Sequence, residues 1–133
     1  MVNDPQRKEV GRIGEKVASK FLQNKGFVII ERNFRKPWGE IDIIAEKGGV
    51  VRFVEVKAVS RENTPDFSRE MDYRPEEMVT VSKLIKLART ANLYMEQKKD
   101  KREFQIDVVG VILNKANKTA RCRLFEQALE ENL

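Results

Sequence analysis

Two acidic residues and one lysine carry the chemistry that the sequence offers most clearly. Asp42 lies in one apolar segment, and Glu55 and Lys57 lie two residues apart in the next one. Side chains two apart on a β-strand point to the same face, and charged groups are almost never buried without partners. Two carboxylates are suitable ligands for Mg²⁺ or Mn²⁺. With a lysine beside it, such an ion favours metal-assisted hydrolysis of a phosphodiester bond.

The same residues also have a purely structural interpretation. Asp42, Glu55 and Lys57 could form an ion-pair network on the solvated face of an antiparallel sheet, because such sheets can leave one face in water. Glu40 shares a face with Asp42 and is either a surface charge or a partner of the site. The residues alone leave both interpretations open.

Composition excludes several other chemistries. The 133 residues contain no histidine, which excludes a Ser-His-Asp triad and histidine-based zinc sites. The single cysteine, Cys122, permits neither an internal disulfide nor a thiolate zinc cluster, and it favours a reducing compartment. The N-terminal segment MVNDPQRKEVGR lacks the apolar region of a secretory signal, and no segment approaches the roughly 20 apolar residues of a membrane span. We therefore expect a soluble cytoplasmic protein that does not act at a membrane.

Apolar periodicity predicts the elements that must position these residues. The expected order is α-β-β-β-α-β-β, which indicates a mixed sheet with helices against it. The Lys-Gly-Gly turn at residues 47–49 predicts a hairpin between the strands that carry Asp42 and Glu55. The expected helices span residues 5–25 and 77–98, and the expected strands span residues 27–35, 39–46, 50–59, 104–113 and 120–125.

Charge is divided unevenly along the chain. The net charge is +5, whereas residues 80–123 alone hold eleven Lys or Arg against four Asp or Glu. Such a basic excess favours an anionic partner, above all nucleic acid. The second helix is predicted to bury one face and to place Lys83 and Lys86 on its opposite side. Its expected core residues are Val81, Leu84, Ile85, Ala88, Ala91 and Met95.

Three further features lie outside the predicted site. Residues 60–76 are polar and contain prolines, and they are predicted to form a long loop of the functional or mobile kind. Trp38 could stack on a nucleic-acid base or pack within its hairpin. Asp107 enters an apolar strand, where we expect it to pair with a nearby arginine.

The spacing of Asp42, Glu55 and Lys57 resembles the Asp…(Asp/Glu)-x-Lys signature of the restriction-endonuclease-like, or PD-(D/E)xK, nucleases. The wider pattern is similar to the YraN-type family of uncharacterised bacterial nuclease-like proteins, which in turn resembles archaeal Holliday-junction resolvases. The segments that carry this resemblance are residues 11–15, 26–27, 31–35, 39–45 and 53–57.

This resemblance implies a fold, a site and a substrate. The fold would be a single restriction-endonuclease-like domain over residues 1–133, an α/β structure with an αβββαβ core and a mixed central sheet flanked by helices. Glu15, Asp42, Glu55 and Lys57 would be catalytic, and Asp42 and Glu55 would bind Mg²⁺ or Mn²⁺. The resemblance favours DNA over RNA as the substrate, including branched or junction DNA, and the residues themselves leave an RNA-directed nuclease open. A homodimer would suit paired incisions.

Basic residues near this set are expected to contact the nucleic acid. They are Arg12, Arg35, Lys83 and Lys86. Two alternatives remain open. Glu15 could simply pair with Arg12, one helical turn before it. The domain could also be a catalytically inactive module that binds nucleic acid or a protein partner on the same fold.

Overall fold

The structure, a computed structural model, describes residues 4–61 and 75–131. Its elements in chain order are α1 (Asp4–Asn24), β1 (Val28–Lys36), β2 (Gly39–Lys47), β3 (Val50–Arg61), η1 (Pro75–Met78), α3 (Val81–Gln97), β4 (Phe104–Asn114), β5 (Thr119–Phe125) and α4 (Ala128–Glu131). The predicted order is confirmed, and the short helices η1 and α4 are additions to it. Most of the predicted loop, residues 62–74, lies outside the described residues. Among the described helices, none is long and apolar enough to cross a membrane.

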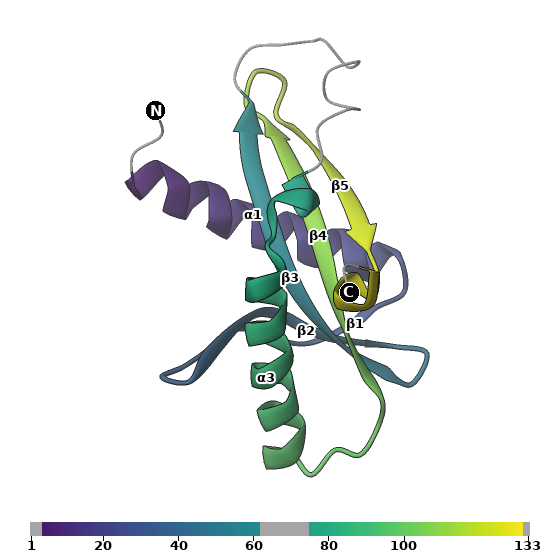
Figure 1. The fold of residues 1–133 in the computed structure, drawn as a ribbon. Coiled ribbons are helices and arrows are strands. Elements are labelled where there is room, and N and C mark those ends of the chain that lie inside the picture. The colour runs from purple at the N-terminus through teal and green to yellow at the C-terminus, as the bar shows by residue number, and fades with distance from the viewer. Residues whose placement is uncertain (1–3, 62–74, 132–133) are drawn as a thin grey trace.

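The five strands form one mixed sheet with a long helix on each face (Figure 1). Their spatial order follows the chain from β1 to β5. Neighbouring strands are antiparallel except for β3 and β4, which are parallel. A parallel pair needs a crossover connection, and α3 lies in the segment between these two strands. The expected mixed sheet flanked by helices is therefore confirmed.

Side chains alternate along β3 between two hydrophobic cores. Val54 is buried in the core beneath α1, and its neighbour Phe53 is buried in the core beneath α3. This is the two-residue periodicity of a strand, and apolar burial on both faces is the main force that holds the helices to the sheet. Glu55 and Lys57 continue the row of Phe53, so they emerge on the α3 side of the sheet.

Gly26 ends α1 and turns the chain toward the sheet. Its φ of 92° lies in the left-handed region, which a residue without a Cβ adopts readily. The Gly26 N–H donates to the Gln23 carbonyl, and the Phe27 N–H donates to the Leu22 carbonyl, each at 3.0 Å. This pair of bonds is a Schellman motif. It leads directly into Phe27, which is buried before β1 begins.

The helix α3 begins later than the sequence predicts, and its buried stripe is made of a partly different set of residues. Thr80 is its N-cap, with the Thr80 hydroxyl accepting a hydrogen bond from the Lys83 N–H at 3.2 Å. The prediction that Val81 and Ile85 are buried is wrong, since each is 37% exposed. The sheet covers only the opposite face of the helix. The residues that α3 does bury are Leu84, Leu87, Thr90, Ala91, Tyr94 and Met95.

Candidate active site

The site begins where β2 and β3 separate. The paired residues of their ladder end at Ile43 and Val54. Beyond this pair a side chain takes the place of a backbone carbonyl as the acceptor: the Asp42 Oδ2 accepts a hydrogen bond from the Val56 N–H at 2.9 Å. On the neighbouring strand β1, Asn33 has a φ of 54°, a left-handed conformation that Asn tolerates better than most residues. Both strands are therefore irregular around Asp42.

This irregularity changes which face the β2 side chains reach. Regular alternation predicts that Ile41 and Ile43 share one face, turned away from Asp42. In the structure Ile43 packs in the core beneath α1, whereas Ile41 packs in the core beneath α3. The predicted shared face is wrong, because the chain bends between these two residues. Asp42 lies at the bend, between the two faces of the sheet.

The helix α1 adds a third carboxylate, that of Glu15. The preceding residue, Gly14, lets the helix lie directly on β3, since a Cβ at this position would clash with the Cβ of Ala58. We call Glu15, Asp42 and Glu55 the acidic cluster. Their side chains are 14%, 16% and 10% exposed, respectively. Three elements that are far apart in sequence thus bring three carboxylates to the gap between two strands.

The acidic cluster concentrates negative charge in a poorly solvated place. Burial, followed by the nearby charge of Asp42, raises the pKa of Glu15 from its ordinary value of 4.5 to about 7. The same two causes raise the pKa of Glu55, against the opposing effect of Lys83. Desolvated like charges disfavour their own ionised forms. Carboxylates perturbed in this way are typical of catalytic and cation-binding sites.

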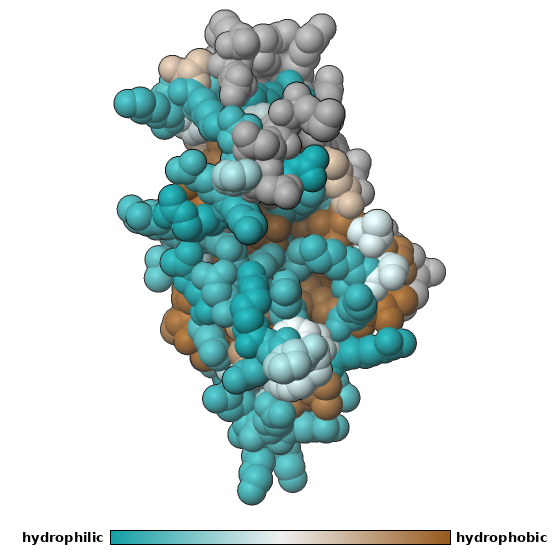
Figure 2. Space-filling model, turned by 90° about the vertical axis from the view of Figure 1, so that its left-hand side faces the viewer, coloured by the Kyte–Doolittle hydropathy of each residue, from teal (hydrophilic) through white to brown (hydrophobic). Residues whose placement is uncertain are grey.

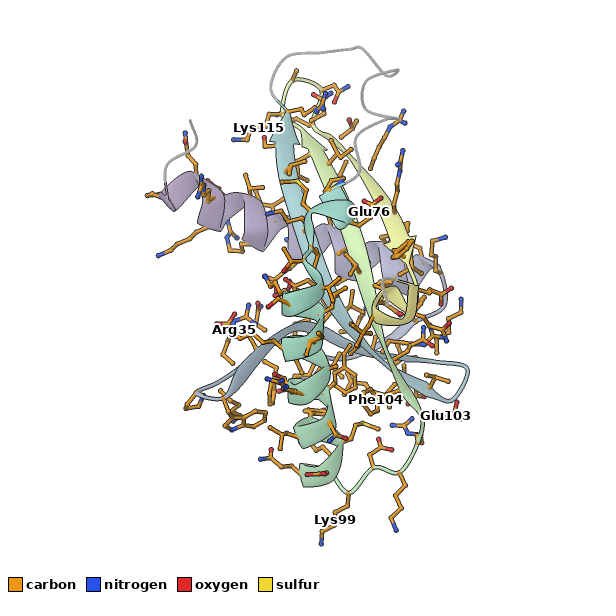
Figure 3. All side chains as sticks on the ribbon, in the orientation of Figure 1. Arg35, Glu76, Lys99, Glu103, Phe104 and Lys115 are labelled. Atoms are coloured by element: carbon orange, nitrogen blue, oxygen red, sulfur yellow. The ribbon has the colours of Figure 1, made fainter. Side chains whose placement is uncertain are left out.

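Two cations partly neutralise the acidic cluster. The Arg35 Nη2 lies 3.3 Å from the Asp42 Oδ1 and 3.9 Å from the Glu15 Oε1. The Lys83 Nζ lies 2.7 Å from the Glu55 Oε1. In Figure 3, Arg35 lies on the hairpin formed by β1 and β2, to the left of α3. Arg35 and Lys83 were predicted to contact phosphates, whereas in the structure they contact the protein's own carboxylates.

Asn33 is a residue of the site that sequence reasoning missed. With its amide nitrogen turned toward Glu15, it donates hydrogen bonds to both carboxylate oxygens, at 2.8 and 3.0 Å. Its only signal in the sequence is its position within residues 31–35, one of the segments that carry the family resemblance. The contact joins β1 to α1, so no local pattern could have identified it.

Lys57 emerges from the same face of β3 as Glu55, as alternation predicts. The parallel ladder runs without a register shift over residues 51–61, and it pairs Glu55 with Val108 and Lys57 with Gly110. Lys57 is partly buried. No carboxylate among the described residues lies within ion-pair distance of its ammonium group. Lys57 therefore forms no ion pair with any of the three carboxylates of the acidic cluster.

The donor chemistry of Asp42 and Glu55 fits a hard divalent cation. Mg²⁺ is usually held by one or two carboxylates together with substrate phosphates. A cation here would relieve the repulsion that raises the pKa of Glu55. In the part of the chain that the structure describes, no three acidic, cysteine or histidine side chains are close enough together to enclose an ion. Asp42 and Glu55 would hold such an ion together with a bound phosphate.

The other two predicted phosphate contacts lie in different surroundings. Arg12 is largely exposed, and its Nη2 lies 3.6 Å from the Glu9 Oε1. The alternative pairing of Glu15 with Arg12 is therefore wrong. Lys86 is on the exposed side of α3, where it lines a groove together with Lys83. The structure thus brings Lys83 and Lys86 beside the acidic cluster and gives Arg12 a separate contact.

The structure also places two residues named outside the site. Asp107 is fully buried, and its Oδ2 accepts a hydrogen bond from the Arg52 Nη1 at 3.4 Å, which confirms the expected arginine partner. Trp38 packs edge-on against Phe34, with ring centroids 5.7 Å apart, as expected for packing within the hairpin. Trp38 nevertheless keeps 39% of its surface exposed.

Comparison with known proteins identifies a family. Residues 14–111, which include all four expected catalytic residues, match the family described as "Uncharacterised protein family UPF0102". A UPF0102 protein of Dictyoglomus thermophilum is 38% identical over 113 residues, covering 84% of this chain and 88% of the relative. A UPF0102 protein of Clostridium botulinum (strain Loch Maree) is 36% identical over 128 residues, covering 92% and 95%. A UPF0102 protein of Campylobacter fetus is 40% identical over 102 residues, covering 77% and 82%. The chain belongs to the family UPF0102.

Proposed function

We propose that this protein is a divalent-metal-dependent endonuclease that hydrolyses phosphodiester bonds in DNA, on a restriction-endonuclease-like, PD-(D/E)xK fold. The observation that carries the proposal is the acidic cluster, to which α1, β2 and β3 each contribute one carboxylate. Lys57 emerges on the same face of β3 as Glu55. Burying like charges together is unfavourable. A site that binds a cation and a phosphate would explain why the protein keeps such a cluster.

Each residue has a defined part in this proposal. Asp42 and Glu55 would hold Mg²⁺ or Mn²⁺. When bound, such an ion polarises a phosphoryl oxygen and makes water more acidic. The Lys57 ammonium orients the attacking water and neutralises the charge that develops on the phosphate. Glu15 completes the site from the α1 side, where Asn33 fixes the direction of its carboxylate.

The resemblance to nucleases also supports finer proposals about the substrate and the assembly. It favours DNA over RNA, and branched or junction DNA among the forms of DNA. It favours a homodimer, since two sites related by a two-fold axis would make paired incisions. The single cysteine, Cys122, favours a cytoplasmic location. Lys83 and Lys86 support nucleic acid as the partner, because they place positive charge beside Glu55.

A catalytically inactive module that binds nucleic acid or a protein partner on the same fold is the second candidate function. The observation in its favour is the ion pair between Lys83 and Glu55, which satisfies a proposed metal ligand without a metal. The two candidates differ in their dependence on metal. A binding module retains DNA equally well in EDTA and in Mg²⁺.

A cleavage panel tests the proposal. Labelled linear duplex, single strand, flap and four-way junction are each incubated with EDTA, Mg²⁺ or Mn²⁺. We expect metal-dependent cleavage of at least one substrate, and a rate reduced about 100- to 1,000-fold in Lys57→Ala, because a preorganised charge at the phosphate is lost. Lys101→Ala is the matched control, since it removes one exposed lysine in the connection between α3 and β4.

Either of two results would contradict the proposed enzyme. Equal cleavage by the wild type and Lys57→Ala would point to a contaminating nuclease. Salt-sensitive DNA retention without cleavage in any metal would favour the binding module.

A further inference from the structure

A groove of about 740 Å³ runs between the hairpin of β1 and β2 and the helix α3. Residues 36–40, at the turn of the hairpin, form one wall, and Glu55 of the acidic cluster belongs to the lining. The opposite wall consists of Thr80 at the N-cap and of Ser82, Lys83, Lys86, Leu87, Arg89 and Thr90 from α3. Figure 2 views the molecule from the side on which this hairpin turn projects, and mostly hydrophilic side chains cover that side.

The charges of the groove favour an anionic ligand. Its four cations are Lys36, Lys83, Lys86 and Arg89, and its two carboxylates are those of Glu40 and Glu55. Lys83 is paired with Glu55 at 2.7 Å, and Glu40 is paired with Arg35 at 3.9 Å. No described carboxylate lies within ion-pair distance of the remaining cations, Lys36, Lys86 and Arg89. Unpaired cations that line one groove raise the local concentration of anions.

Trp38 presents a rigid aromatic surface in the same groove. It is 39% exposed, and its inner side packs against Phe34 with ring centroids 5.7 Å apart at 62°. Phe34 in turn packs against Tyr94 at 5.3 Å, and Tyr94 packs against Phe53 at 5.6 Å. This series of edge-to-face contacts anchors the indole in the core beneath α3. An anchored, exposed ring binds a flat partner with little further loss of conformational entropy.

The position of the hairpin wall relative to α3 is set by a close backbone approach. A Cβ at Gly39 would clash with the hydroxyl and methyl groups of Thr90. Thr90 is buried, and its hydroxyl donates to the Lys86 carbonyl at 3.1 Å. The glycine therefore lets the hairpin turn lie directly on the helix. Trp38, the residue before Gly39, is held beside the basic residues of α3.

We propose that this groove binds a single-stranded segment of nucleic acid, with phosphates beside Lys86 and Arg89 and one base stacked on Trp38. This inference rests on the proposed function and specifies its substrate, which would carry an unpaired stretch next to the bond that is cut. In a continuous duplex the faces of the bases are covered by their neighbours, so an indole can stack only on a base that has left the stack. Glu55, in the lining of the groove, links the bound strand to the acidic cluster.

Intrinsic fluorescence tests the proposal directly, because Trp38 is the only tryptophan in the chain. The full chain is titrated in EDTA, which prevents metal-dependent cleavage, with an oligothymidylate or with a duplex of equal length. We expect saturable quenching by the single strand and little quenching by the duplex. In a parallel anisotropy titration with labelled oligothymidylate, Trp38→Ala weakens binding about 10- to 100-fold, whereas Trp38→Phe keeps most of the affinity.

Two matched controls separate the groove from general surface effects. Phe125→Ala removes an aromatic ring of equal exposure, 40%, from β5, and it leaves the affinity unchanged. Lys86→Ala reduces the slope of log affinity against log salt by about 0.7, as expected for one lost phosphate contact on a single strand. Lys115→Ala does not, because Lys115 lies at the opposite end of the molecule from the hairpin turn (Figure 3).

Three results would overturn the proposal. They are equal quenching by duplex and single strand, binding of the single strand without quenching, and an affinity that survives Trp38→Ala. Thermal melts identify a variant that fails to fold, and Trp38→Phe then carries the comparison. Cleavage that is insensitive to Lys57→Ala contradicts the proposed enzyme and leaves the quenching result standing. Lys57-dependent cleavage with no quenching contradicts only the single-strand groove.

Discussion

The molecule buries acidic side chains in two places, at Asp107 and in the acidic cluster, and the partners of these carboxylates differ. Asp107, on strand β4, is fully buried, and every oxygen of its carboxylate has a donor. Its Oδ1 accepts from the Gln105 Nε2 at 2.8 Å and from the Gln127 N–H at 3.0 Å, and its Oδ2 accepts from the Arg52 Nη1 at 3.4 Å. Burial raises the pKa of Asp107, and all three of these partners oppose that rise.

In the acidic cluster a neighbouring carboxylate adds to the effect of burial. Burial again comes first, but for Glu15 and Glu55 the next cause is the like charge of Asp42, which raises their pKa further. The surrounding cations, Arg35 and Lys83, oppose the rise without cancelling it. Burial of charge alone is therefore no mark of a functional site. A group of buried like charges that the protein leaves only partly neutralised is such a mark.

Removing Arg52 should have the largest effect on stability. Arg52→Met keeps much of the side-chain volume and leaves Asp107 without its cation, so we expect a loss of about 3 kcal/mol in the free energy of unfolding. Urea unfolding at pH 7 measures the change. The cleavage rate per folded molecule should be unaffected. A loss below about 1 kcal/mol would contradict the structural role assigned to this pair.

Neutralising Glu15 should increase the free energy of unfolding, whereas removing Arg52 should decrease it. The pKa of Glu15 is about 7 in the folded protein against 4.5 ordinarily, so its ionisation destabilises the folded state above pH 7. Below pH 4.5 the group is protonated in both states and this contribution vanishes. Glu15→Gln should therefore stabilise the metal-free protein by about 2 kcal/mol at pH 8, and the gain should decline as the pH falls from 7 toward 4.5. Urea unfolding in EDTA at pH 8, 6 and 5 tests this, and a pH-independent loss of stability would contradict it.

Mg²⁺ should stabilise the wild-type protein at pH 8, because binding to the folded state shifts the unfolding equilibrium. At ten times its dissociation constant the ion adds about 1.4 kcal/mol. Thermal melts with and without Mg²⁺ measure the effect. Glu55→Gln should abolish it, whereas the matched variant Glu40→Gln, at an exposed carboxylate, should keep it. Equal stabilisation of all three proteins would indicate non-specific binding.

Of these substitutions, Arg12→Ala should change the free energy of unfolding least. Its ion pair with Glu9 is exposed on both sides, and such pairs contribute only a few tenths of a kcal/mol. A change in unfolding free energy above about 1 kcal/mol would reveal a further contact of Arg12. If Arg12 also contacts phosphate, the salt dependence of DNA binding will weaken while the preference among DNA forms stays the same.

Much of the fold was predictable because its signals are local. Apolar periodicity identified the long helices and the strands, and the Lys-Gly-Gly turn identified one hairpin. The failures are non-local. Val81 and Ile85 continue an apolar helical pattern, but α3 turns a different set of residues toward the sheet, so each of the two stays 37% exposed. Ile41 and Ile43 lie in different cores although regular alternation places them on one face, and the left-handed conformation of Asn33 on the neighbouring strand has no local sequence signal.

The candidate site likewise contains one part that local spacing predicts and another that depends on tertiary structure. Glu55 and Lys57 share a face because they are two apart on one strand, which spacing alone predicts. Glu15 approaches Asp42 only because Gly14 lets α1 lie on β3. The contacts of Arg35 with Glu15 and Asp42 also depend on tertiary structure, because the sequence shows that Arg35 is charged but not which carboxylates it contacts.

The most direct test of the account compares Glu55→Gln with Asp107→Asn in one Mg²⁺-dependent cleavage assay, after urea unfolding has established the folded fraction of each. Both variants neutralise one buried carboxylate on adjacent strands. We predict that Glu55→Gln loses about a thousandfold in rate while remaining folded, and that Asp107→Asn cleaves at the wild-type rate per folded molecule. Undiminished cleavage by Glu55→Gln, or an equal loss in both variants, would contradict the claim that the acidic cluster is the active site.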